Sequence, residues 1–361
     1  MNERLTEINF VDKSLASWPQ EKIELVKTEG IDKFPEFFKT GIDVWIIQSY
    51  ILLHDSERFN VCISSALKKN CVNVIHRSQV SAKECREFFV VSVRADRDPL
   101  VNAHIEIVQN RSSVWSPRHL FIPHWPQPGL IKRDVNRRES IENVSFFGKS
   151  CHLSDEFKTT EFSERLSTLS CKLQIHEKDW WDYSKTDIVL AFREGYTFYL
   201  NFKPASKLVN AWNAGVPAIL GKEAAYRELK TTCFDYIEIA SAEDALAHIK
   251  YLKSHPEVYR RMIENGRQKA NMFSRNRIRE LWLEKLELIE DYYSDFQSKN
   301  NFMRFFINKS GFCFLVSCVR QRVWGWQAGQ FPIRPSRYYF GVVRTFLVFP
   351  RIILAMKKYK N

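Results

Sequence analysis

Two basic residues, Arg193 and Lys207, lie at positions where the chain could bind a phosphate group. Arg193 follows an apolar run, residues 186–192 (TDIVLAF), which has the composition of a buried strand. Lys207 lies in the first turn of a helix expected over residues 206–214, with Ser206 as its expected N-cap. The start of a helix carries partial positive charge and free N–H groups, so a lysine there is unfavourable unless an anion lies nearby. Together these residues predict a diphosphate site.

The residues that follow show how this helix is expected to pack. Leu208, Ala211, Trp212 and Gly215 recur at helical spacing and form an apolar face, and Gly215-Val216-Pro217 ends the helix. A strand is expected over residues 216–220. An ordinary αβ unit of a parallel sheet explains these features without any ligand, so the structural and the functional interpretations both stay open here.

The same stretch resembles the donor-binding segment of glycosyltransferases of the GT-B fold. The resemblance rests on Lys207-Leu208, Ala211, residues 214–217 (AGVP) and Glu228 in that order, and it covers roughly residues 143–290. It implies that Lys207 and Arg193 bind the diphosphate of a nucleotide-sugar donor. It further implies that Glu228 binds the ribose hydroxyls, with Glu223 as the alternative acidic contact.

One position departs from the pattern of that family. Many retaining members have two glutamates eight positions apart, whereas this chain has Phe202 and Asn210 there. We expect Asn210 at the donor site, and the choice between retaining and inverting chemistry stays open. A non-catalytic, membrane-attached module that keeps a nucleotide-binding fold is the alternative function.

A catalytic base, if the reaction needs one, is expected from the first half of the chain. His54 follows the apolar run 44–53, His76 ends the run 72–76, and His124 lies in a proline-rich segment. Each of the three is a candidate base, and each is equally interpreted as a hydrogen-bonded loop histidine.

Asp96-x-Asp98 is a candidate metal site, because paired carboxylates suit a divalent cation on a diphosphate. Arg94 and Arg97 flank the pair, so salt bridges explain the carboxylates as well. We expect no metal and no cofactor, which is also what the resemblance implies, with the nucleotide sugar as co-substrate. No Walker A or G-x-G-x-x-G motif is present.

The elements that must position these residues alternate between apolar and amphipathic runs. The pattern predicts an α/β fold of two Rossmann-like, doubly wound domains facing a cleft, over residues 1–135 and 136–295, with a basic helical tail over 296–361. Residues 114–140 are expected to form an ordered linker. Strands are expected at 44–53, 60–64, 72–76, 88–93, 104–108, 143–150, 173–176, 186–192, 216–220 and 234–239, and helices at 206–214, 241–252, 256–273 and 275–293.

The tail carries the whole excess of positive charge. The chain has 54 basic and 42 acidic residues, and 12 basic residues follow the last acidic one, Asp295, which leaves 54 − 12 = 42 against 42 elsewhere. Basic residues interleaved with aromatic ones favour attachment to an anionic membrane surface. Packing on the protein's own surface and nucleic-acid binding are the alternatives, and no nucleic-acid motif supports the second.

Cysteine usage and the N-terminal sequence indicate the cellular compartment of the protein. None of the eight cysteines forms a CxxC pair, and residues 1–14 contain no apolar stretch typical of a secretory signal. We therefore expect a cytoplasmic protein, peripheral on the inner face of the membrane, whose acceptor is a lipid-linked or cell-surface glycan.

Overall fold

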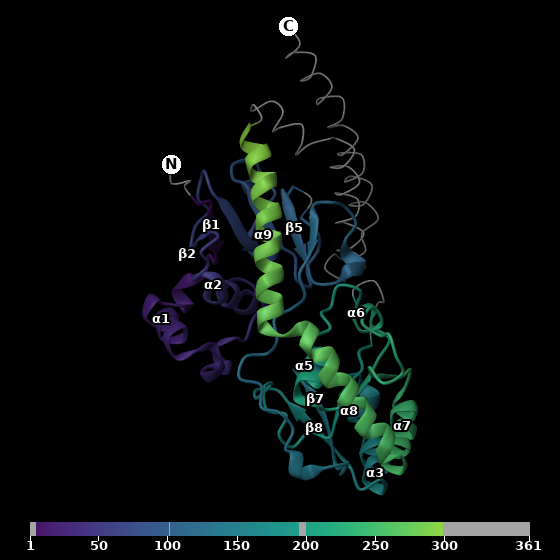
Figure 1. The fold of residues 1–361 in the computed structure, drawn as a ribbon. Coiled ribbons are helices and arrows are strands. Elements are labelled where there is room, and N and C mark those ends of the chain that lie inside the picture. Colours follow the sequence, from purple (N-terminus) through teal and green to yellow (C-terminus); the bar gives the residue numbers. More distant parts are fainter. Residues whose placement is uncertain (1–4, 101, 195–199, 299–361) are drawn as a thin grey trace, which may run out of the picture.

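The computed structural model describes residues 5–100, 102–194 and 200–298, and in it two parallel β-sheets lie one above the other (Figure 1). This is the α/β architecture of two sheets that the sequence predicts. The first sheet has the strand order β2-β1-β3-β4-β5-β6, and all its pairings are parallel. Its strands are β1 (Glu7–Val11), β2 (Asn60–Ser64), β3 (Val72–His76), β4 (Val90–Val93), β5 (Ile105–Val108) and β6 (His119–Phe121).

Two strands of the first sheet were missed in the sequence. β1 is short and lies in a mainly polar N-terminal region, yet it pairs with both β2 and β3 inside the sheet. β6 lies within residues 114–140, which we expected to be linker alone, and it pairs with β5 at the edge of the sheet. An edge strand of three residues leaves little trace in a sequence.

The expected strand at residues 44–53 is wrong, because this run is helical. A π-helical turn, Asp43–Ile47, continues directly into α2 (Gln48–Leu53). Nearly every side chain of the run is buried, including Trp45 and Tyr50. A helix that is buried on all sides has no polar face, so its sequence shows no helical period and is indistinguishable from a buried strand.

Two helices, α2 and α9 (Arg275–Ser298), pack against strands of the first sheet, and α1 (Gln20–Glu29) packs against α2. Trp282 of α9 contacts the rings of Phe10 and Trp45 at centroid distances of 5.9 and 6.5 Å. Phe89 packs against Tyr293 near the end of α9 at 5.0 Å. α9, which the sequence analysis places in the second domain, therefore packs on the first.

The second sheet has the strand order β11-β10-β9-β7-β8, again with all pairings parallel. Each of its strands lies within or beside a range that the sequence predicts. The elements of this half are β7 (Asn143–Phe147), α3 (Thr160–Thr168), β8 (Lys172–His176), β9 (Ile188–Ala191), α5 (Ser206–Ala214), β10 (Ala218–Leu220), α6 (Ala224–Arg227), β11 (Ile237–Glu238), α7 (Ala242–Ser254) and α8 (Pro256–Ala270).

Helix packing in this half fixes the position of α5. Trp212 of α5 is buried, donates its indole N–H to the carbonyl of Asp235 at 2.9 Å, and lies against Gly266 of α8. A methyl group at Gly266 would come within 2.9 Å of the Trp212 ring. The N-cap of α7 is Ser241, whose hydroxyl accepts from the Asp244 backbone N–H.

The predicted basic tail falls almost wholly in residues 299–361, outside the described residues. The three domain bounds stay predictions. Within the part of the chain that the structure describes, no helix is both long and apolar enough to cross a membrane.

Candidate functional site

The carboxyl ends of β7 and β9 mark the point where the strand order of the second sheet reverses. β7 is first in the sequence, and the chain continues to β8 on one side of it and then to β9 on the other. Ligands of open α/β sheets bind in the crevice at such a point. Gly148 follows β7, Arg193 follows β9, and the first turn of α5 lies beside them, so the predicted diphosphate residues meet where the topology favours a ligand.

The N-terminus of α5 differs from the expectation in one respect. The helix begins at Ser206, its N-cap is Ala205, and no side chain caps it. Ser206 is therefore not the N-cap. An uncapped helix start leaves backbone N–H groups for other partners, including an anion.

Lys207 points from the first turn of α5 toward the end of β7. Its Nζ lies 5.2 Å from the centroid of the Phe146 ring and 3.7 Å from the position that a Cβ on Gly148 would occupy. It forms no hydrogen bond or ion pair with any described residue. Burial lowers the pKa of Lys207 to about 7, and the charge of Arg193 adds to the lowering. This ammonium group has a charge that an anion would stabilise.

Glu223 binds Arg193 and completes the cluster. Its Oε2 accepts from Nη1 of Arg193 at 2.8 Å, while its buried Oε1 has no hydrogen-bond partner among the described residues. The hydroxyl of Tyr226, also buried and one turn on, likewise has none. Burial raises the pKa of Glu223. The positive charges of Arg193 and Lys207 lower it, but the effect of burial is larger. Buried polar atoms without a hydrogen-bond partner favour the binding of a ligand or a proton.

Three basic residues near this cluster were missed in the sequence. The pKa of His152 is lowered by burial and by the positive charges of Arg193, Lys203, Lys207 and Lys149, in decreasing order of effect. His152 therefore lies near all four of these basic residues. Lys149 follows Gly148 at the end of β7. Its position after a strand ending in glycine was the available sign, whereas Lys203 gave no sign of its own.

Glu228 lies at the contact between the two domains. Its carboxylate accepts from the backbone N–H groups of Arg111 and Ser112 in the first domain, each at 3.1 Å. In this structure its two oxygens are therefore occupied by protein. Of the two acidic residues expected at the donor, Glu223 joins the basic cluster, and Glu228 binds the first domain.

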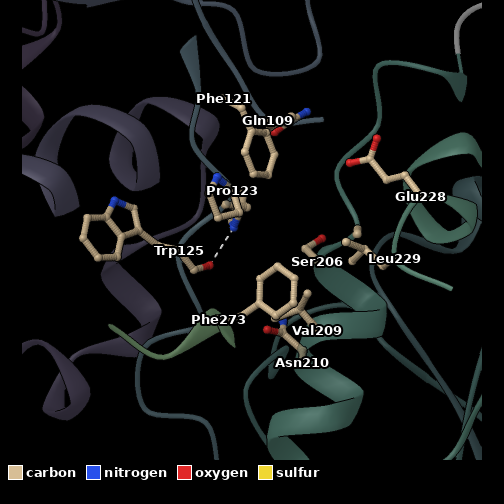
Figure 2. Close-up of a pocket in the computed structure, with 12 residues that line it drawn as sticks. Gln109, Phe121, Pro123, Trp125, Ser206, Val209, Asn210, Glu228, Leu229 and Phe273 are labelled. Atoms are coloured by element: carbon tan, nitrogen blue, oxygen red, sulfur yellow. Dashed lines mark hydrogen bonds between the residues drawn. The ribbon is translucent and has the colours of Figure 1, made fainter. Parts of the chain in front are cut away.

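Asn210 lines a pocket between the domains. The pocket lies between the first-domain segment with Phe121 and Trp125 and the N-terminal half of α5, with Ser206 and Asn210 on its α5 wall (Figure 2). Glu228 and Gln109 also line it. It thus adjoins the helix start that carries Lys207.

The three candidate bases occupy different places. His54 ends α2, with its Nδ1 at 2.8 Å from the carbonyl of Ile51, and it does not line the pocket. His124 lines the pocket, and its Nδ1 lies 2.7 Å from the carbonyl of Trp125. His76 ends β3 and is buried, and burial lowers its pKa to about 4.

The two carboxylates of the candidate metal pair bind separate cations. Asp98 binds Arg77 at 2.5 Å, and Asp96 binds Lys203 of the second domain at 2.7 Å. Among the described residues, no group of three or more His, Cys, Asp and Glu side chains is placed to hold a metal ion.

No protein-family model and no curated protein matches this chain. Its fold is similar to that of several solved structures. The GtfA/B complex has 11% identity and a TM-score of 0.42 over 68% of this chain and 60% of that chain. Anabaena HepE in complex with UDP and glucose has 11% and 0.45, over 78% and 99%. AviGT4, a glycosyltransferase involved in avilamycin A biosynthesis, has 11% and 0.47, over 78% and 96%.

The chain thus spans 60% of the length of the GtfA/B chain and nearly all of HepE. All three TM-scores are below 0.5. Function is therefore inferred from the residues of this chain and from where its fold places them.

Proposed function

We propose that this protein is a glycosyltransferase that binds a nucleoside-diphosphate sugar on its second domain and transfers the sugar to an acceptor held by the first. The observation that supports this most directly is the Lys207 ammonium group. It lies at the switch point of a parallel sheet, at an uncapped helix start, and without an acidic partner among the described residues. Those are the features of a site for a phosphate group.

The cluster has the charges that such a transfer requires. When the bond between the sugar and the diphosphate breaks, negative charge develops on the leaving phosphate oxygen. Arg193 and Lys207 would stabilise that charge, and removing one such group from an enzyme typically costs about 10²- to 10³-fold in rate. The open Oε1 of Glu223 is an acceptor for a hydroxyl of the donor.

We further propose that the acceptor lies at a membrane surface. A lipid-linked or cell-surface glycan fits a protein whose last 66 residues carry basic and aromatic residues but no acidic one. Attachment to an anionic membrane would bring the first domain close to such an acceptor. The cytoplasmic side of the membrane fits this proposal, because the proposed reaction requires a nucleotide sugar as its donor.

The test is a panel of UDP-glucose, UDP-N-acetylglucosamine, UDP-galactose, GDP-mannose and dTDP-rhamnose. Binding of each is measured by calorimetry, and slow transfer to water by release of free sugar. We expect at least one to bind and to be hydrolysed by the wild-type chain, and we expect Lys207→Ala to lose both properties. Lys222→Ala, an exposed lysine on the neighbouring loop, serves as the matched control.

Each outcome has a clear meaning. Binding with no sugar release under any condition would favour the non-catalytic module. No binding of any member of the panel would overturn the proposed donor site altogether.

A further inference from the structure

Asp96 is an acidic residue of the first domain that the proposed donor site does not use. It follows β4 at the carboxyl end of the first sheet, next to Ala95, whose φ of +49° is in the left-handed region. Such a conformation costs a non-glycine residue roughly 1 to 2 kcal/mol and tends to occur at functional sites. The strained turn directs the Asp96 side chain across the boundary between the domains.

Asp96 meets Lys203 of the second domain there. The Nζ of Lys203 lies 2.7 Å from Oδ2 of Asp96. The segment that carries this lysine is held against the first domain through its backbone, since the side chain of Asn110 donates to the carbonyls of Asn201 and Lys203 at 3.0 Å each, and that of Gln109 donates to the carbonyl of Phe202. The ion pair is part of a built contact between the two domains.

Lys203 also belongs to the basic cluster of the donor site. The charge of Lys203 lowers the pKa of Lys207 and that of Glu223. In both cases burial and the charge of Arg193 have larger effects on the pKa. One ammonium group therefore lies between the carboxylate of the first domain and the phosphate site of the second. A diphosphate bound beside Lys207 would compete with Asp96 for Lys203.

Two imidazoles lie near Asp96, and each has its Nδ1 bound to a neighbouring group. The Nδ1 of His76 is bound to Ser78 at 2.7 Å, and its Nε2 faces the backbone of Gly41. His124 has its Nδ1 at a carbonyl, and burial lowers its pKa. Asp96 keeps an exposed fraction of 38% of its side chain, so a substrate can reach its carboxylate.

Burial raises the pKa of Asp96, but the charge and hydrogen bond of Lys203, with the charges of Arg97 and His76, outweigh it and hold the pKa below its ordinary value. As long as Lys203 is bound, the carboxylate is a weak base. Withdrawal of Lys203 toward a phosphate would remove the largest of these opposing charges and make Asp96 more basic.

We propose that Asp96 accepts the proton of the acceptor hydroxyl, and that Lys203 releases it for this step when the donor diphosphate binds. The inference rests on the proposed function. The acceptor oxygen forms the bond to the anomeric carbon of the sugar as its proton passes to Asp96. The bond from that carbon to the diphosphate breaks, and its electron pair stays on the leaving phosphate beside Arg193 and Lys207. Attack on the face opposite the leaving group inverts the anomeric centre.

The experiment compares the wild type with Asp96→Asn and Asp32→Asn, using the member of the nucleotide-sugar panel that binds most tightly and water as acceptor. Asp32 forms a comparable ion pair with Arg275, away from the pocket, and serves as the control for loss of such a contact. We expect Asp96→Asn to lower kcat about 100-fold or more, as removal of a general base does. Its affinity for the nucleotide sugar should be unchanged or higher, because Lys203 is no longer bound to Asp96. Asp32→Asn should keep both values.

The anomeric configuration of the sugar first released by the wild type, followed by NMR, tests the inference without any variant. Inversion is expected. Retention, or an Asp96→Asn variant with wild-type kcat, would overturn the role of Asp96 while leaving the donor site intact. Failure of the wild type to bind any nucleotide sugar would overturn the proposed function itself.

Discussion

At the scale of single residues, local position in the sequence indicated Arg193 and Lys207, whereas Glu223 came from the family resemblance as the alternative to Glu228. Arg193, Lys207 and Glu223 each follow a strand end or start a helix of the same sheet, so the topology of a parallel sheet brings them together. Glu228 was placed by family pattern alone, and in the structure it binds the first domain. The pair of Asp96 and Lys203 could not be predicted, because it joins residues 107 positions apart across two domains.

The protonation state of Lys207 should make donor binding depend on pH. Its pKa of about 7 means that the ammonium form, which an anion favours, is lost as the pH rises through neutrality. The diphosphate of a nucleotide sugar keeps its charge over this range. We expect affinity to be highest below pH 7 and to fall by about tenfold between pH 7 and about pH 8.5.

Calorimetry at several pH values measures this directly. In Lys207→Met the affinity should be lower throughout and nearly independent of pH, since Arg193 keeps its charge. A wild-type affinity that is constant across the range, or one that rises with pH, would contradict the assignment.

At the scale of elements, the second half of the chain was predicted more closely than the first. The strands and helices from β7 to α8 show a plain alternation of apolar runs and amphipathic helices, and α5 has the bounds expected for it. In the first half, the run 44–53 is buried on all sides and β6 is three residues long. Burial removes the polar period that separates helix from strand, and short edge strands leave too few residues to recognise.

The contact between α5 and α8 should be sensitive to a single methyl group. Gly266→Ala gains about 1 kcal/mol of helix propensity, but the added carbon at 2.9 Å from the Trp212 ring forces the two helices apart. We expect the clash to dominate and the Tm to fall by about 2 to 6 °C. Because α5 carries Lys207, donor affinity should fall as well.

A thermal melt monitored by intrinsic fluorescence, together with calorimetry, measures both effects. Gln268→Ala, an exposed position on the same helix, is the control and should melt as the wild type does. A Gly266→Ala variant that is more stable than the wild type would show that the helices are not packed as described.

At the scale of the whole molecule, α9 connects the two halves by returning from the second domain to pack on the first sheet (Figure 1). The sequence predicted two α/β domains and a cleft, and the two parallel sheets confirm that division of the fold. It did not predict the return of α9, because the helix has the same amphipathic pattern whichever sheet it covers. The pocket and the Asp96–Lys203 pair both lie where the halves meet.

The basic tail should attach the molecule to anionic membranes. Each lysine or arginine near such a surface contributes about 1 kcal/mol, so 12 of them give strong binding that weakens with salt. We expect the full chain to float with vesicles containing phosphatidylglycerol and not with vesicles of phosphatidylcholine alone. A chain ending at Asp295 should stay at the bottom of the gradient in both cases, and equal partition of the two chains would refute this role.

The most direct test of the central claim is a calorimetric titration of UDP, GDP, ADP, dTDP and CDP into the wild type, Lys207→Ala and Lys222→Ala. If the cluster at the ends of β7 and β9 is a diphosphate site, at least one nucleotide binds the wild type and the Lys222→Ala variant alike. Lys207→Ala should bind it at least tenfold more weakly, about 1.4 kcal/mol in binding free energy. Equal affinity of all three proteins for that nucleotide would contradict the account, because binding would then take place elsewhere on the molecule.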